Sequence, residues 1–63
     1  MLMSRAEALR CRNQTVECLR FWQRAVVDPS KSWKLRYEAA VMIDACKETI
    51  SDFDLILSLI PEA

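Results

Sequence analysis

The chain has 63 residues, with nine basic and nine acidic side chains, three cysteines, no glycine and no histidine. This length indicates one small domain, and the lack of glycine excludes phosphate-binding loops and nucleophile elbows. A zinc site is not expected without histidine or a Cys-x-x-Cys pair, and an odd cysteine count with no signal-like N-terminus argues against disulfides.

The apolar fraction of the sequence is 52%, which is too high for a disordered chain. Its longest apolar run is too short to cross a bilayer, so no membrane partner is expected. A single core of this size rarely stabilises a fold alone. The sequence therefore predicts an all-α cytoplasmic protein that associates with itself.

The first predicted helix covers about residues 4–26. Ser4 and Glu7 have the spacing of a capping box at its start. Largely apolar residues then recur in steps of three and four, which defines one helical face. This face consists of Ala8, Cys11, Thr15, Cys18, Trp22 and Ala25 or Val26, widened by Val16 and Leu19.

Asp28 and Pro29 interrupt this pattern. Aspartate is a preferred N-cap and proline a preferred first helical residue, so we expect a turn at residues 27–31 and a second helix over about residues 29–60. The two helices form the predicted antiparallel hairpin of a single domain, residues 1–63. The segment of residues 51–54 also has capping-box spacing, which leaves a short third helix after Ser51 as an alternative.

The second helix carries two apolar stripes. The first is heptad-like and forms the predicted core and dimer contact: Leu35, Ala39, Met42, Cys46, Ile50, Phe53, Leu57 and Ile60. The second lies on another side of the helix: Trp33, Tyr37, Ala40 and Val41. Because one partner helix cannot cover both stripes, we expect the hairpin to form a homodimer that resembles a four-helix bundle.

Charge is divided along the chain. Residues 1–36 hold eight basic and three acidic side chains, a net charge of +5, and residues 37–63 hold one basic and six acidic side chains, a net charge of −5. An antiparallel hairpin brings these halves together. With a turn near residue 28, we expect Arg5 to face Asp52 and Arg12 to face residues 44–48.

Basic and aromatic side chains gather near the turn. Three interpretations are open: nucleic-acid binding, a contact site for a protein, or aromatic packing in which Trp22 and Trp33 close the end of the hairpin. A sequence pI of about 6.2 is low for a dedicated nucleic-acid binder. The candidate surface is Arg20, Arg24, Lys31, Trp33, Lys34, Arg36 and Tyr37.

The cysteines and the paired carboxylates do not indicate catalysis. Cys11, Cys18 and Cys46 fall on apolar stripes and are interpreted as small buried hydrophobes. The carboxylates at positions 44 and 48, and at 52 and 54, suit a solvated helix face rather than a pocket that shifts pKa values. We expect no enzyme activity, cofactor, metal or small-molecule substrate.

The stretch of residues 27–40 (VDPSKSWKLRYEAA), with the size of the chain, resembles the small helical early-region proteins of lambda-like temperate phages. That resemblance implies a protein of the host bacterial cytoplasm that influences the lytic–lysogenic choice or the host cell cycle through binding. Pro29 followed by Trp33 is also similar to the needle co-chaperones of type III secretion, which cover an aggregation-prone helix. The longer second helix and the charge division depart from that pattern.

Overall fold

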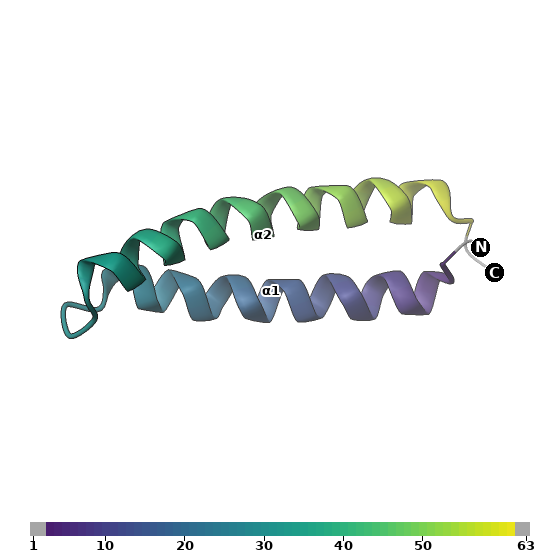
Figure 1. Cartoon of the computed structure of the whole chain (residues 1–63). Helices are drawn as coiled ribbons and strands as arrows, with labels where there is room; N and C mark the ends of the chain where they lie inside the picture. Colours follow the sequence, from purple (N-terminus) through teal and green to yellow (C-terminus); the bar gives the residue numbers. More distant parts are fainter. Residues whose placement is uncertain (1–2, 62–63) are drawn as a thin grey trace.

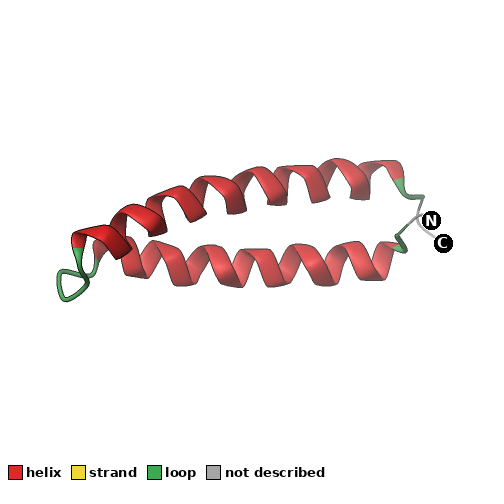
Figure 2. Cartoon of the chain, in the orientation of Figure 1, coloured by secondary structure: helices red, strands yellow, loops and turns green. Residues whose placement is uncertain are grey.

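The computed structural model describes residues 3–61, which form two antiparallel helices, α1 (Arg5–Val27) and α2 (Trp33–Leu59), and no strand (Figures 1 and 2). α1 begins and α2 ends at the same end of the molecule, opposite the turn (Figure 1). The chain measures 47 × 17 × 14 Å. The predicted all-α hairpin is confirmed over these residues.

α1 begins as its sequence predicts. The Ser4 hydroxyl accepts a hydrogen bond from the Glu7 backbone N–H at 3.1 Å and donates one to the Glu7 carboxylate at 3.0 Å. These bonds satisfy a backbone donor that the first turn of a helix leaves free, and they place an acidic residue at the positive end of the helix dipole. α1 ends where the Asp28 N–H donates to the Ala25 carbonyl at 3.3 Å.

The predicted start of the second helix is wrong by about one helical turn. Asp28 is the C-cap of α1, and α2 begins at Trp33 with Ser32 as its N-cap. The Ser32 hydroxyl accepts from the Leu35 N–H at 3.2 Å, and the Asp28 carboxylate accepts from the N–H and the hydroxyl of Ser30 at 2.9 and 2.7 Å. Asp28 therefore stabilises a tight turn instead of capping a helix.

α2 is one continuous helix of 27 residues, so the alternative of a third helix after Ser51 is wrong. Ser51 lies inside the helix, and the hydrogen-bonded run passes through it to Leu59. The apolar periodicity keeps its phase through this position and no glycine or proline interrupts it, so nothing in the local sequence ends the helix.

The most buried positions between the helices hold small residues. Ala8, Ala25, Ala39 and Cys46 are the buried apolar side chains, and among the described residues no large side chain is fully buried. Small side chains let two helices approach closely, but they remove little apolar area from water. The hairpin thus has a narrow seam and leaves its larger apolar groups partly in solvent.

The register of the helices differs from the expected one. Arg12 pairs with Asp54, Nε to Oδ1 at 2.6 Å, instead of facing residues 44–48. Arg5 donates from Nη1 to the carbonyls of Leu57 and Ile60 at 3.0 and 3.3 Å, beyond the expected Asp52. The cause is the turn: residues 28–32 lie outside both helices and displace α2 along α1. Within the described residues, neither helix combines the length and the hydropathy needed to cross a bilayer.

Candidate interaction surfaces

A groove of about 410 Å³ runs along one edge between the helices, and none of the described residues that line it is charged. One wall of the groove is formed by α1 and the other wall by α2. The lining is Cys11, Gln14, Thr15, Cys18 and Trp22 from α1, and Met42, Ala45, Cys46, Thr49 and Phe53 from α2.

The two walls of this groove have the same spacing. On α1 the lining positions follow in steps of 3, 1, 3 and 4, and on α2 the steps are again 3, 1, 3 and 4. Equal spacing on two antiparallel helices means that each presents the same part of its surface to the groove. The groove is therefore a second apolar face of the hairpin, beside the seam, and each helix contributes equally to it.

The opposite edge of the hairpin is polar. The ion pair of Arg12 with Asp54 and the bonds from Arg5 to the end of α2 lie across it. Both arginines are partly covered, so their alkyl stems shield the seam on this side. Charged groups therefore cover one edge of the hairpin, whereas no described residue that lines the groove at the other edge is charged.

Trp22 connects the groove to two further hollows. One, of about 430 Å³, lies toward the outer face of α2 and is lined by Trp22, Tyr37, Glu38, Val41 and Met42. The other, of about 360 Å³, lies at the turn. The half-buried indole ring also makes an edge-to-face contact with Phe21, with ring centroids 5.0 Å apart. Trp22 therefore borders both the groove and the cavity at the turn.

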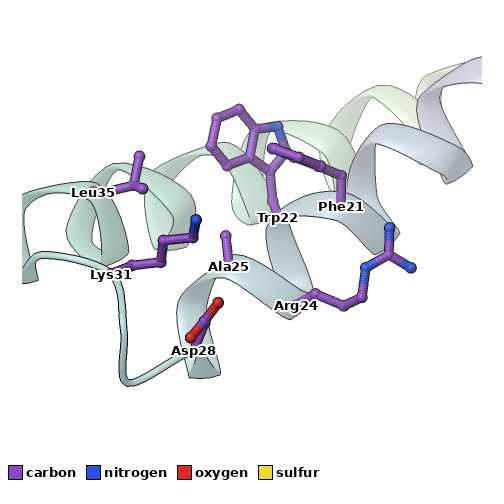
Figure 3. Close-up of a pocket in the computed structure, with 7 residues that line it drawn as sticks. All are labelled: Phe21, Trp22, Arg24, Ala25, Asp28, Lys31 and Leu35. Atoms are coloured by element: carbon purple, nitrogen blue, oxygen red, sulfur yellow. The ribbon is translucent and has the colours of Figure 1, made fainter.

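The turn cavity is lined by Phe21, Trp22, Arg24, Ala25, Asp28, Lys31 and Leu35. Figure 3 shows the Lys31 side chain reaching from the turn toward Ala25, with the two aromatic rings beyond it and Arg24 directed away. The two bonds from Ser30 hold the pKa of Asp28 below its ordinary value, the hydroxyl contributing most, and the charges of Lys31 and Arg36 lower that pKa further.

The predicted basic and aromatic surface is exposed, and it does not close the hairpin. Trp33 is 79% exposed and Tyr37 67%, so the interpretation of Trp33 as an end plug is wrong. Trp22 does lie half-buried beside the seam. Arg36 donates from Nε to the Val26 carbonyl at 3.1 Å. The side chains of the four other cations form no hydrogen bond or ion pair with any described residue: Arg20, Arg24, Lys31 and Lys34.

The predicted core stripe of α2 divides into three groups. Ala39 and Cys46 are buried, and Met42 is 39% exposed at the groove. The remaining members are half-buried: Leu35, Ile50, Phe53, Leu57 and Ile60. The second stripe, Trp33, Tyr37, Ala40 and Val41, is exposed along its whole length. The hairpin by itself covers neither stripe completely.

The cysteines occupy three different environments. Cys46 is buried at 6% exposure, Cys11 is intermediate and Cys18 is exposed, so the interpretation of all three as buried is wrong for Cys18. All three line the groove. No group of cysteine and carboxylate side chains in the described part of the chain has the arrangement of a metal site.

Sequence reasoning missed three groove residues, Gln14, Ala45 and Thr49. Each lies three or four positions from a predicted stripe residue, so each borders the stripe on one side. That spacing was the available signal. However, each stripe has a border on both of its sides, and without the register of the two helices the sequence does not show which border faces the groove. Comparison of the chain with known protein families, curated proteins and solved structures finds no match.

Proposed function

We propose that the protein is a non-enzymatic interaction protein that acts as a homodimer, with the uncharged grooves of two hairpins facing each other in a four-helix bundle. The observation that carries this proposal is the combination of an apolar groove without charges and, among the described residues, a seam without a large buried side chain. Exposed apolar surface that is continuous and free of charge is typical of a protein contact.

The exposed surface area of the chain supports the binding of a second hairpin. The hairpin exposes 5001 Å². A compact monomer of 7.3 kDa exposes roughly 4,200 Å² by the scaling of folded proteins. The excess of about 800 Å² comes from the elongated shape of the hairpin, and it is similar to the area that one partner buries in an interface of standard size.

The resemblance to early-region phage proteins extends this proposal. In that setting the dimer acts in the bacterial cytoplasm and binds a host or phage protein that controls the lytic–lysogenic choice or the cell cycle. Trp33 is the exposed aromatic side chain that a dimer through the groove leaves available for such a protein, because it lines none of the described hollows.

A matched pair of alanine substitutions tests the groove. Ala45 lines the groove and Ala40 lies exposed on the same helix outside every described hollow. Light scattering across a range of concentrations should give twice 7.3 kDa for the wild type and for Ala40→Arg. Ala45→Arg should give a monomer, because an arginine there puts an unpaired charge into the interface.

Two results would contradict the proposal. A folded wild-type monomer at every concentration would leave the groove to a different protein, as in the needle co-chaperones. A dimer that survives Ala45→Arg would place the contact on another surface.

Nucleic-acid binding is a second candidate, favoured by the cations near the turn that bond to no described residue and by the exposed Trp33 beside them. It predicts binding that weakens steeply with salt. A gel shift with single-stranded and duplex DNA at low salt should then show a complex, and changing Arg24, Lys31, Lys34 and Arg36 to alanine should remove it. The absence of any complex at low salt excludes this candidate.

A further inference from the structure

We propose that the cavity at the turn binds a small aromatic carboxylate. This inference goes beyond the proposed homodimer and does not depend on it, because the cavity is formed by one hairpin alone. Its volume is about 360 Å³. Small-molecule sites in proteins range from about 300 to 1,000 Å³, so the cavity has the size of a site for a compact ligand.

The cavity follows from a small residue in the last turn of α1. Ala25 lines it and is itself only 7% exposed. Trp22, one helical turn earlier on α1, and Leu35 on α2 line the same cavity with much larger side chains. Protein interiors are filled by side chains at close packing, so a methyl group at position 25 leaves space beside these two residues.

The apolar part of the lining suits an aromatic ring. Phe21 and Trp22 already make an edge-to-face contact, with ring centroids 5.0 Å apart, and both line the cavity. A third ring beside such a pair gains the same offset or edge contacts. An apolar cavity of about 150 Å³ holds benzene, so the turn cavity has room for one ring and a short carboxylate arm.

Lys31 supplies a positive charge to the cavity. Figure 3 shows its side chain reaching from the turn toward Ala25, with the aromatic rings beyond it and Arg24 directed away. The Lys31 side chain forms no hydrogen bond or ion pair with a described residue. A ligand carboxylate next to the rings would accept a charge-assisted hydrogen bond from this ammonium group.

Asp28 limits the charge of the ligand. Its carboxylate lines the cavity and accepts two hydrogen bonds from Ser30, at 2.9 and 2.7 Å. The charged lining therefore consists of two cations, Arg24 and Lys31, and one anion. A phosphate would bring a second negative charge toward Asp28, whereas a carboxylate brings only the one that Lys31 pairs with. The lining thus favours a ligand with a single negative charge.

Nuclear magnetic resonance tests the inference, because the two indole N–H groups give separate signals. Phenylacetate is the probe, and phenylacetamide has the same ring without the charge. Phenylacetate should shift the Trp22 signal with a dissociation constant on the order of 1 mM. The Trp33 signal should stay in place, because Trp33 lines none of the described hollows. Phenylacetamide should bind about tenfold more weakly, because it lacks the pair with the ammonium group.

Three variants locate the ligand. Lys31→Met should weaken phenylacetate binding about tenfold and leave phenylacetamide binding unchanged, because it removes only the charge. Lys34→Met is the matched control, since it removes the same charge from an exposed position that lines none of the described hollows. Ala25→Met should abolish the binding of both probes, because the longer side chain fills the cavity. Circular dichroism shows whether each variant remains helical.

Several outcomes would overturn the inference. Equal shifts of both indole signals would show non-specific contact with exposed rings, and equal affinity for the two probes would remove the role of the charge. Binding that is insensitive to Lys31→Met, or that survives in a helical Ala25→Met variant, would place the ligand on another surface. The two lysine variants decide the question alone if Ala25→Met does not fold.

Discussion

Two tryptophans in similar basic surroundings have opposite roles in this fold. Trp22 is half-buried, packs against Phe21 and lines three hollows, whereas Trp33 projects into solvent from the first turn of α2. A side chain stabilises the fold in proportion to the area that folding removes from water. Composition alone treats these residues as equivalent, and only their positions relative to the seam distinguish them.

Removing each indole should therefore have unequal effects. Trp22→Ala should lower the free energy of unfolding by about 2–4 kcal/mol, in the range of large-to-small changes at partly covered aromatic sites. Trp33→Ala should change it by less than about 0.5 kcal/mol. Urea unfolding followed by circular dichroism measures both, at one protein concentration. Equal losses would mean that Trp33 is covered in the folded protein.

Asp28 gives the turn a dependence on pH. Its folded-state pKa lies below the ordinary value of 3.8 because it accepts two hydrogen bonds from Ser30. A carboxyl with a lowered pKa stabilises the folded state at pH values above 3.8, and this contribution is lost as the pH falls through the folded-state pKa.

Thermal unfolding between pH 7 and pH 3 should show this loss. Asp28→Asn should melt slightly below the wild type at neutral pH and lose less stability on acidification, so that the two melting temperatures converge. Asp44→Asn is the control, because the Asp44 side chain forms no hydrogen bond or ion pair with a described residue. Parallel curves for Asp28→Asn and the wild type would show that the turn carboxylate does not contribute.

At the scale of the helices, the start of α2 is where sequence and structure differ most. Asp28 followed by Pro29 is a typical helix start, yet Asp28 bonds to Ser30 and the cap is Ser32. Both assignments satisfy local preferences, and the difference lies in whether residues 29–31 join the helix or the turn. Since α1 ends at Val27, the chain needs these residues to reverse direction before α2 can pack.

Serine substitutions distinguish a cap from an interior position. Ser32→Ala should reduce the free energy of unfolding by about 1 kcal/mol, because the Leu35 N–H loses its acceptor. Ser51→Ala should be neutral or slightly stabilising, because alanine is the better residue inside a helix. Chemical unfolding measures both variants. A loss of similar size at position 51 would mean that a helix begins there.

At the scale of the whole molecule, the sequence was sufficient for the all-α hairpin and for its charge division. Helical periodicity and one interruption decide the fold, and both are local properties. The groove depends on register, and register depends on how many residues the turn uses. An error of one helical turn in α2 therefore leaves the fold intact but moves every cross-helix pair, as the partner of Arg12 shows.

The small residues of the seam also make the stability of the folded protein depend on its concentration. Ala8, Ala25 and Ala39 hold the helices together with little buried area, so the isolated hairpin gains little from folding. In the proposed dimer, stability rises with concentration by mass action. At concentrations below the dissociation constant of the dimer, the chains would then spend more time unfolded and be degraded. At higher concentrations, dimer formation would protect them. Such a protein would respond to its own rate of synthesis with a threshold.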